Sequence, residues 1–275
     1  MNLTVTRLNG TTYSLADYGI KTLDFVIDSP SPRHETEIID GADGFIDMGT
    51  TYDGRSMRGS FMMYAVDLAD YPLLRNEVFR MFASKEAFYL VDDREPGKRW
   101  LVKVASAFSM EQMRKFGRFE VEFISASPYA ESEKSTLEDG FDPTYYFGSA
   151  TSMIPISQYT INGAGTTNFQ ILNGGDVATD PRRQYIKVEY DGVLPAELSI
   201  RNNTTGEVWT YTTGASAGAT ARVKLDGVRY VKNDIVSIFS LTNRKFFTIA
   251  PGMNDFTVIG GSSYVITFDF RFYLL

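Results

Sequence analysis

The chain has 275 residues, of which 43% are hydrophobic and 22% charged, so it is long enough to bury one large or two ordinary hydrophobic cores. The formal net charge of −7 argues against a partner that is a polyanion, and the absence of cysteine excludes disulfides, thiolate metal sites and thiol catalysis. Aromatic residues are abundant, with 20 Phe and 16 Tyr, and they favour pleated, half-buried surfaces. A mainly β fold is therefore the first expectation.

The charge is spread unevenly along the chain. Residues 1–135 contain 16 Lys/Arg against 21 Asp/Glu, and residues 136–275 contain 11 against 13. We expect no sequence-specific binding of nucleic acid. The N-terminus lacks the features of a signal peptide, and no stretch approaches the ~18 apolar residues of a membrane span. We therefore expect a protein that is made in a cytoplasm, with no membrane insertion.

Short alternating runs between residues 3 and 27 predict two or three strands, with a tight turn at Asn9-Gly10. Pro30 and Pro32 lack a backbone N–H, so residues 29–33 are predicted to form a loop or an edge crossing.

A cluster of acids beside two glycines follows, at Asp40, Asp43 and Asp47. Convergent carboxylates suit a calcium ion, but the spacing matches no calcium loop and no closing Glu is present. Asp-Gly pairs favour turns, so we predict turns here, with no metal site and no cofactor.

The centre of the first half is a strand followed directly by a helix. The run Arg58–Tyr64 predicts the strand, and Asp67 or Asp70 is the expected helix N-cap, with Pro72 in the first turn. An apolar stripe of this helix consists of Leu74, Val78, Met81 and Phe82. Such a stripe must pack on a sheet, and this is the only long helix that the sequence predicts.

A hairpin and a one-sided strand follow the helix. Residues 88–91 and 100–104 are apolar runs joined by a charged tip around Pro96-Gly97, which we interpret as a solvated turn or a protein contact. In the run Phe116–Ile124, apolar and charged residues alternate, as is typical of an antiparallel strand with one wet face.

An acidic, polar stretch from about residue 133 to residue 143 predicts a boundary between a domain 1–137 and a domain 138–275. The second half shows no helical periodicity. Short apolar runs separated by glycine turns predict a β-sandwich. The expected strands are 169–172, 185–190, 196–200, 207–211, 221–225, 235–239, 247–249, 254–258 and 264–270.

No catalytic residues are predicted. His34 is the only histidine and lies in a proline-rich stretch, and no nucleophile motif or phosphate-binding loop occurs. Two carboxylate pairs could in principle serve a glycosidase, but a turn and a wet strand face explain them better. They are Asp92 with Asp93 and Glu120 with Glu122. Trp209 and Tyr211 share a strand face and are candidate ligand-facing aromatics that could stack on a sugar. Such residues are found more often in hydrophobic cores and in interfaces.

Several segments together resemble the distal tail proteins of long-tailed phages. In the first half these are Tyr52-Asp53-Gly54-Arg55 and the strand that runs to Ser127-Pro128-Tyr129-Ala130. In the second half they are Asn173–Pro181, Asn203–Glu207, Ala250–Phe256 and the terminal run Phe268–Arg271. Each motif consists mostly of turn-forming residues, and the resemblance rests on the order of the motifs across nearly the whole chain.

The resemblance implies a β-rich N-terminal belt domain with one helix, followed by a galectin-like β-sandwich. It also implies a structural hub at the tail tip of the virion, made in the host bacterial cytoplasm and not an enzyme. Such a hub is a homo-hexamer whose ring lets DNA pass. Its partners are the tail tube protein, the tail-associated fibre or lysin protein, and receptor-binding or baseplate proteins. The alternative is a carbohydrate-binding adhesin module that contacts the host cell wall.

We expect ring contacts in the first half, on the side of the helix away from its apolar stripe and on the charged hairpin. The interface candidates are Arg75, Arg80, Arg94, Arg99 and Trp100, with Trp100 as the anchor. An acid-rich loop at residues 40–47 would face the hairpin of the next copy, because a closed ring needs two different complementary patches on each subunit.

Overall fold

The structure is a computed structural model that describes residues 1–41, 43–141 and 159–275. It contains two compact units, Met1–Glu131 with Leu275, and Ser132–Leu274. The division follows residue 131, whereas the sequence predicts it after residue 137. The part of the predicted boundary stretch beyond Phe141 lies outside the described residues.

The first unit is built from strands and a single α-helix. Its elements are β1 Leu3–Arg7, β2 Thr12–Ser14, the 3-10 turn η1 Leu15–Tyr18, β3 Ile20–Ile27, β4 Pro32–Glu37, β5 Ile46–Tyr52, β6 Arg55–Tyr64, α1 Tyr71–Met81, β7 Phe88–Asp92, β8 Lys98–Val104, β9 Met110–Met113 and β10 Phe116–Ser125, and the short β11 Ala130–Ser132 crosses the division between the units. Most strands pair in the order β2-β1-β7-β8-β10-β6-β3, with β9 added beside β10, and β4 pairs only with β5. Every pair in this order is antiparallel. The longest ladder joins β6 to β10 from Tyr64↔Phe116 to Arg55↔Ser125.

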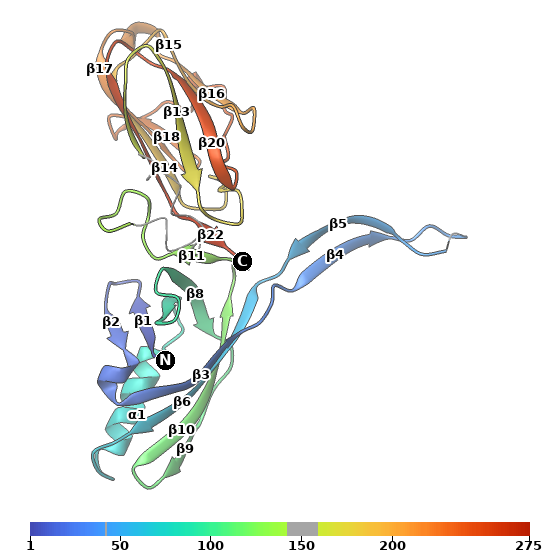
Figure 1. Cartoon of the computed structure of the whole chain (residues 1–275), viewed down its shortest axis with the longest axis vertical. Helices are drawn as coiled ribbons and strands as arrows, with labels where there is room; N and C mark the ends of the chain where they lie inside the picture. The colour runs from blue at the N-terminus through green and yellow to red at the C-terminus, as the bar shows by residue number, and fades with distance from the viewer. Residues whose placement is uncertain (42, 142–158) are drawn as a thin grey trace. The chain divides into compact units, whose positions relative to one another are not determined.

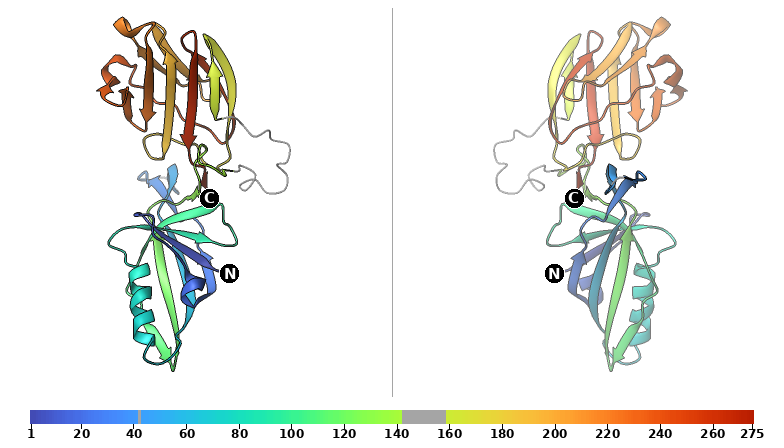
Figure 2. Two further views of the ribbon diagram at one scale, coloured as in Figure 1. Left: turned by 90° about the vertical axis from the view of Figure 1, so that its left-hand side faces the viewer. Right: turned by 90° about the vertical axis from the view of Figure 1, so that its right-hand side faces the viewer.

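The helix lies against one face of this sheet, as the apolar stripe predicts (Figure 2). Val78, Met81 and Phe82 are buried, and Leu74 packs against the same core. The Phe82 ring lies 5.8 Å from that of Phe61 and 5.6 Å from that of Phe123, between centroids. Because these rings come from the C-terminal cap of α1, from β6 and from β10, one aromatic cluster joins the end of the helix to the two central strands.

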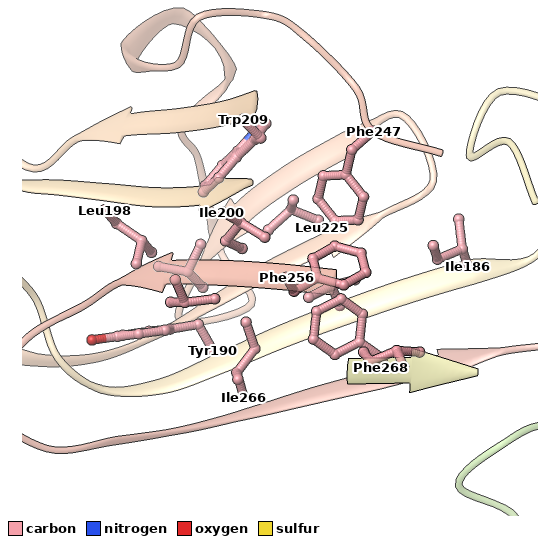
Figure 3. Close-up of a cluster of buried hydrophobic side chains, with 14 of the residues drawn as sticks. Ile186, Tyr190, Leu198, Ile200, Trp209, Leu225, Phe247, Phe256, Ile266 and Phe268 are labelled. Atoms are coloured by element: carbon pink, nitrogen blue, oxygen red, sulfur yellow. The ribbon is translucent and has the colours of Figure 1, made fainter. Parts of the chain in front are cut away.

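The second unit is a β-sandwich, also as predicted. Its elements are β12 Thr160–Gly163, β13 Thr166–Asn173, β14 Ile186–Val193, β15 Glu197–Asn202, β16 Val208–Thr212, η4 Gly214–Ser216, β17 Thr220–Asp226, β18 Arg229–Lys232, β19 Val236–Ser237, η5 Phe239–Leu241, β20 Gly252–Ile259, β21 Tyr264–Phe270 and β22 Tyr273–Leu274. One sheet has the order β12-β21-β14-β17-β18-β19 and the other β13-β20-β15-β16. Their facing sides enclose one hydrophobic core, in which Trp209, Phe247, Phe256 and Phe268 lie between the strands (Figure 3).

Two expected strands of the second unit are wrong. In the run 235–239 only Val236–Ser237 forms a strand, followed by a 3-10 turn, because Asn233 and Asp234 adopt positive φ and turn the chain ahead of it. The run 247–249 makes only the isolated bridge Thr179↔Ile249. Among the described residues, no helix is both long and apolar enough to cross a membrane.

We predict that Phe82→Ala lowers the free energy of unfolding of the first unit by about 3–5 kcal/mol, because it leaves a cavity among buried rings. Leu73→Ala, at an exposed position of the same helix, should change it by no more than about 0.5 kcal/mol. Urea denaturation followed by Trp100 fluorescence in a Trp209→Phe background isolates this unit. Equal losses in the two variants would contradict the packing described.

Candidate assembly surface

The most exposed part of the first unit is the two-stranded ribbon β4–β5, which we call the arm (residues 31–53). It continues from the ends of β3 and β6, and among the described residues its two strands pair only with each other (Figure 1). Every described residue of the arm is exposed. Around its tip several large apolar side chains face water, among them Ile38 at 77% exposure and Phe45 at 67%. An apolar surface of this kind needs a partner.

Polar contacts near the base of the arm fix its register. Arg33 Nη1 donates to Asp53 at 3.0 Å and its Nη2 to the Thr51 hydroxyl at 3.1 Å, while His34 Nδ1 lies 2.8 Å from the Thr50 hydroxyl. The pairing shifts by one residue between Glu35 and Thr36, and an irregularity of this kind bends and twists a ribbon. His34 therefore helps to hold the two strands of the arm together.

The arm leaves the sheet at a tightly packed junction. The Arg55 guanidinium stands over the Trp100 ring at 5.1 Å, its Nε donates to the Asp28 carbonyl at 2.7 Å and its Nη1 to the Pro128 carbonyl at 3.2 Å. Burial lowers the pKa of Arg55. A Cβ at Gly54 would lie 2.4 Å from the Ser125 carbonyl oxygen, so only glycine fits beside that strand.

This junction brings Gly54 and Arg55 of the motif Tyr52-Asp53-Gly54-Arg55 against Ser125 and the Pro128 carbonyl. It also corrects the role expected for Trp100. That side chain is 5% exposed and packs inside its own subunit under Arg55, so it has no free face with which to anchor a neighbour.

The arginines of the charged hairpin likewise find their hydrogen-bond partners within the subunit. Arg94 donates to Asp92 through Nε at 2.9 Å and to the Phe25 carbonyl through Nη2 at 3.0 Å, and the hydrogen bond with Asp92 raises the pKa of Arg94. Arg99 donates to Glu131 at 2.9 Å and stacks 3.8 Å from the centroid of the Tyr89 ring. Reversing either charge would break these internal contacts, so such variants do not report on an interface alone.

On the helix, Arg80 is exposed and pairs with Glu77, which leaves most of its side chain in water. Arg75 is half-buried, and its Nε has no hydrogen-bond partner among the described residues. Of the five predicted interface residues, Arg80 and Arg94 are exposed, although Arg94 also donates to Asp92 and to the Phe25 carbonyl. Arg75 and Arg99 are half-buried, and Trp100 is buried.

The aromatic pair of the second unit is buried. Trp209 and Tyr211 are at most 1% exposed, and Trp209 packs edge-on against Tyr230 with their ring centroids 5.6 Å apart. The expectation that they face a ligand is corrected by this burial, which follows from the inward direction of their strand face. Among the described residues of this unit, the exposed large aromatic side chains are Tyr185 and Phe239.

The asparagines of the C-terminal motifs hold turns together. Asn173 donates to the carbonyl groups of Val177 and Ile249, at 3.0 and 2.9 Å. Asn254 accepts from the Ala250 N–H at 2.9 Å and from the Asn202 amide at 3.1 Å. Buried amides must be paired in this way, so these motifs specify loops of the sandwich.

The carboxylates considered for catalysis also have structural surroundings. Ser60 donates to Glu120 at 3.2 Å and Ser106 to Glu122 at 3.1 Å, on the exposed face of β10 beside an open groove of about 450 Å³. Asp92 is the internal partner of Arg94. No group of three or more His, Asp or Glu residues that could hold a metal ion occurs in the described part of the chain.

Comparisons with known proteins agree with this architecture. Residues 8–125 match the family described as the phage tail protein RIFT-related domain. The first unit is a phage tail domain of this family. The match includes the arm and its junction, and it gives the chain a structural role in the phage tail, hence a place in the virion tail. No curated protein sequence matches the chain significantly.

One solved structure extends the likeness in fold to both units of this phage tail protein. The crystal structure of phage SPP1 Dit, described as a paradigm of the hub adsorption apparatus in phages that infect Gram-positive bacteria, aligns with a TM-score of 0.68 at 12% identity, over 98% of this chain and 99% of that one. The baseplate of phage p2 in its activated conformation aligns with a TM-score of 0.46 at 8% identity, over 97% of each chain. The predicted resemblance to distal tail proteins is confirmed, with the fold shared with SPP1 Dit along nearly the whole chain.

We predict that replacing residues 33–51 by Asn-Gly, which makes a two-residue hairpin turn, changes the free energy of unfolding of the first unit by no more than about 0.5 kcal/mol. No described side chain of the replaced segment is buried, whereas the junction at Gly54 and Arg55 is retained. Urea denaturation of the shortened and full-length proteins checks this. A large loss of stability would show that the arm packs on its own subunit.

Proposed function

We propose that this protein is the structural hub of the phage tail tip, a hexameric ring that joins the tail tube protein to the tail-associated fibre or lysin protein and to receptor-binding or baseplate proteins. The observation that carries the proposal is the arm, an exposed ribbon with an apolar tip inside a phage tail domain. No described residue of the first unit covers that tip. A second subunit would cover it in an assembled ring.

A ring is also the arrangement expected when two different surfaces of one subunit bind each other. The arm is a single extended element, so the surface that receives it must be a different patch of the next copy. Contacts between two different patches are heterologous, and they generate a closed ring when the rotation between copies closes. The net charge of −5 in residues 1–135 would let DNA pass the ring without adhering.

The structural surroundings of the carboxylates support a hub that is not an enzyme. A glycosidase holds two carboxyls across the scissile bond in different environments, so that one is the acid and the other the base or nucleophile. Glu120 and Glu122 instead share one exposed strand face, and each accepts a hydrogen bond from a serine. The buried positions of Trp209 and Tyr211 remove one of the two observations that favoured a carbohydrate-binding adhesin and leave only the sandwich fold. We propose the sandwich as a peripheral module that contacts other tail proteins.

We predict that full-length protein has six times the monomer mass in multi-angle light scattering, and that the variant with Asn-Gly in place of residues 33–51 is monomeric at the same concentration. The reason is that the variant keeps its fold and loses the apolar tip. A shortened variant that still forms the hexamer would show that the ring does not depend on the arm.

We also predict that the protein has no wall-degrading activity and no saturable, submillimolar affinity for host-wall saccharides. Turbidity assays on cell walls and calorimetric titration with wall fragments measure these two properties. Activity that is lost in Glu120→Gln or Glu122→Gln would contradict the structural assignment of these residues. Saccharide binding that disappears in Tyr185→Ala, with Phe239→Ala as the matched exposed control, would favour the adhesin.

A further inference from the structure

An open apolar groove of about 690 Å³ lies at the end of the first unit's sheet that is opposite the arm junction. One wall is the loop before α1, with Asp67, Leu68 and Ala69, and the other is the β9–β10 turn, with Arg114, Lys115 and Phe116. Leu68 is exposed, as is Val66 beside it. This groove is not used by any contact described above.

The groove is held in a fixed shape by the chain itself. The Ala65 N–H donates to the Lys115 carbonyl at 3.0 Å, which ties one wall to the other. The rings of Tyr64 and Phe116 pack edge to face at 5.2 Å. Arg114 has a positive φ of 57°, which turns β9 tightly back into β10. A preformed apolar groove of this kind needs little ordering when a ligand enters.

We propose that the groove receives the tip of the arm of a second copy of this chain. The inference rests on the proposed ring and names the surface that receives the arm. The tip presents exposed apolar side chains of a size that can fill the groove, among them Phe45, Ile38 and Ile39. Both surfaces are apolar at their centre, so each would remove the other's apolar area from water.

Charge complementarity favours the arm as the occupant. The tip carries Asp40, Asp43 and Asp47 and has no basic residue between positions 38 and 48. The groove carries Arg114 and Lys115 against Asp67. An acidic tip beside a net basic rim selects the orientation of docking and disfavours contact between two tips, which would repel each other.

The positions of the two surfaces agree with a ring of like subunits. The arm starts beside Arg55, at one end of β6, and the groove lies beyond Tyr64, at the other end. The ten residues of β6 span about 33 Å. Because donor and receiver lie at opposite ends of one strand, a subunit can give its arm to one neighbour and receive an arm from the other.

Disulfide crosslinking tests the docking directly, since the chain has no cysteine of its own. In full-length Phe45→Cys/Leu68→Cys, mild oxidation should give a ladder of covalent oligomers on non-reducing gels, extending to the sixfold species. Phe45→Cys alone and Leu68→Cys alone should give nothing beyond a dimer. The matched control Phe45→Cys/Val228→Cys pairs the tip with an exposed residue of the sandwich and should give no ladder.

The outcomes separate docking from ring formation. If the unmodified protein forms the hexamer but Phe45→Cys/Leu68→Cys gives no more ladder than the control, the docking is wrong and the ring stands, with the groove open to another tail protein. If the unmodified protein is monomeric at every concentration in light scattering, both the ring and the docking are wrong.

A charge exchange provides an independent readout of the same contact. Arg114→Glu should raise the dissociation constant of the oligomer about tenfold or more, and Asp43→Arg should do the same. The double variant should return it to within about threefold of the unmodified value. Arg244→Glu is the control, since Arg244 also has a φ of 57° but lies in the sandwich, and it should change the constant less than twofold. Additive losses in the double variant would overturn the pairing.

Discussion

The packing of Arg55 at the arm junction is the contact on which the first unit's architecture depends. This guanidinium joins the segment that follows β3, through Asp28, to the segment that follows β10, through Pro128, and it covers Trp100. A charged group in such a position must be paired, since leaving it without acceptors costs free energy. The same three contacts lie where β3 and β6 end their packing against the core and the chain continues as the exposed arm.

Much of the fold could be predicted because one-sided burial leaves a periodic pattern. Phe119, Val121 and Phe123 alternate with exposed charges along β10, and this alternation was sufficient to identify the strand and its inner face. The helix was predictable for the same reason, as Val78, Met81 and Phe82 recur with helical spacing. In the second unit, glycine turns between short apolar runs were enough to predict a sandwich.

The arm could not be predicted from such a pattern. Both faces of the ribbon are exposed, so there is no buried face to produce an alternation of apolar and polar residues. Its residues follow no apolar alternation, and Pro32 argued against a strand although proline is tolerated as the first residue of one. For a related reason, the sequence does not show that three of the interface candidates already have partners in their own subunit. Sequence shows that Trp100, Arg94 and Arg99 are suited to contacts but does not show whether the partner belongs to the same subunit, and here it does. The apolar residues between positions 38 and 48 are the available signal for the candidate assembly surface.

A free ribbon with an apolar tip is also a hazard, since unpaired edges and exposed apolar side chains promote uncontrolled association. The composition of the arm limits that risk. Asp40, Asp43 and Asp47 interrupt the apolar residues and make the tip negatively charged, so the tips of two copies repel each other. The negative charge that keeps two tips apart would also attract a tip to a basic groove. The acids are therefore better understood as setting which surface the arm can bind than as ligands for a metal ion.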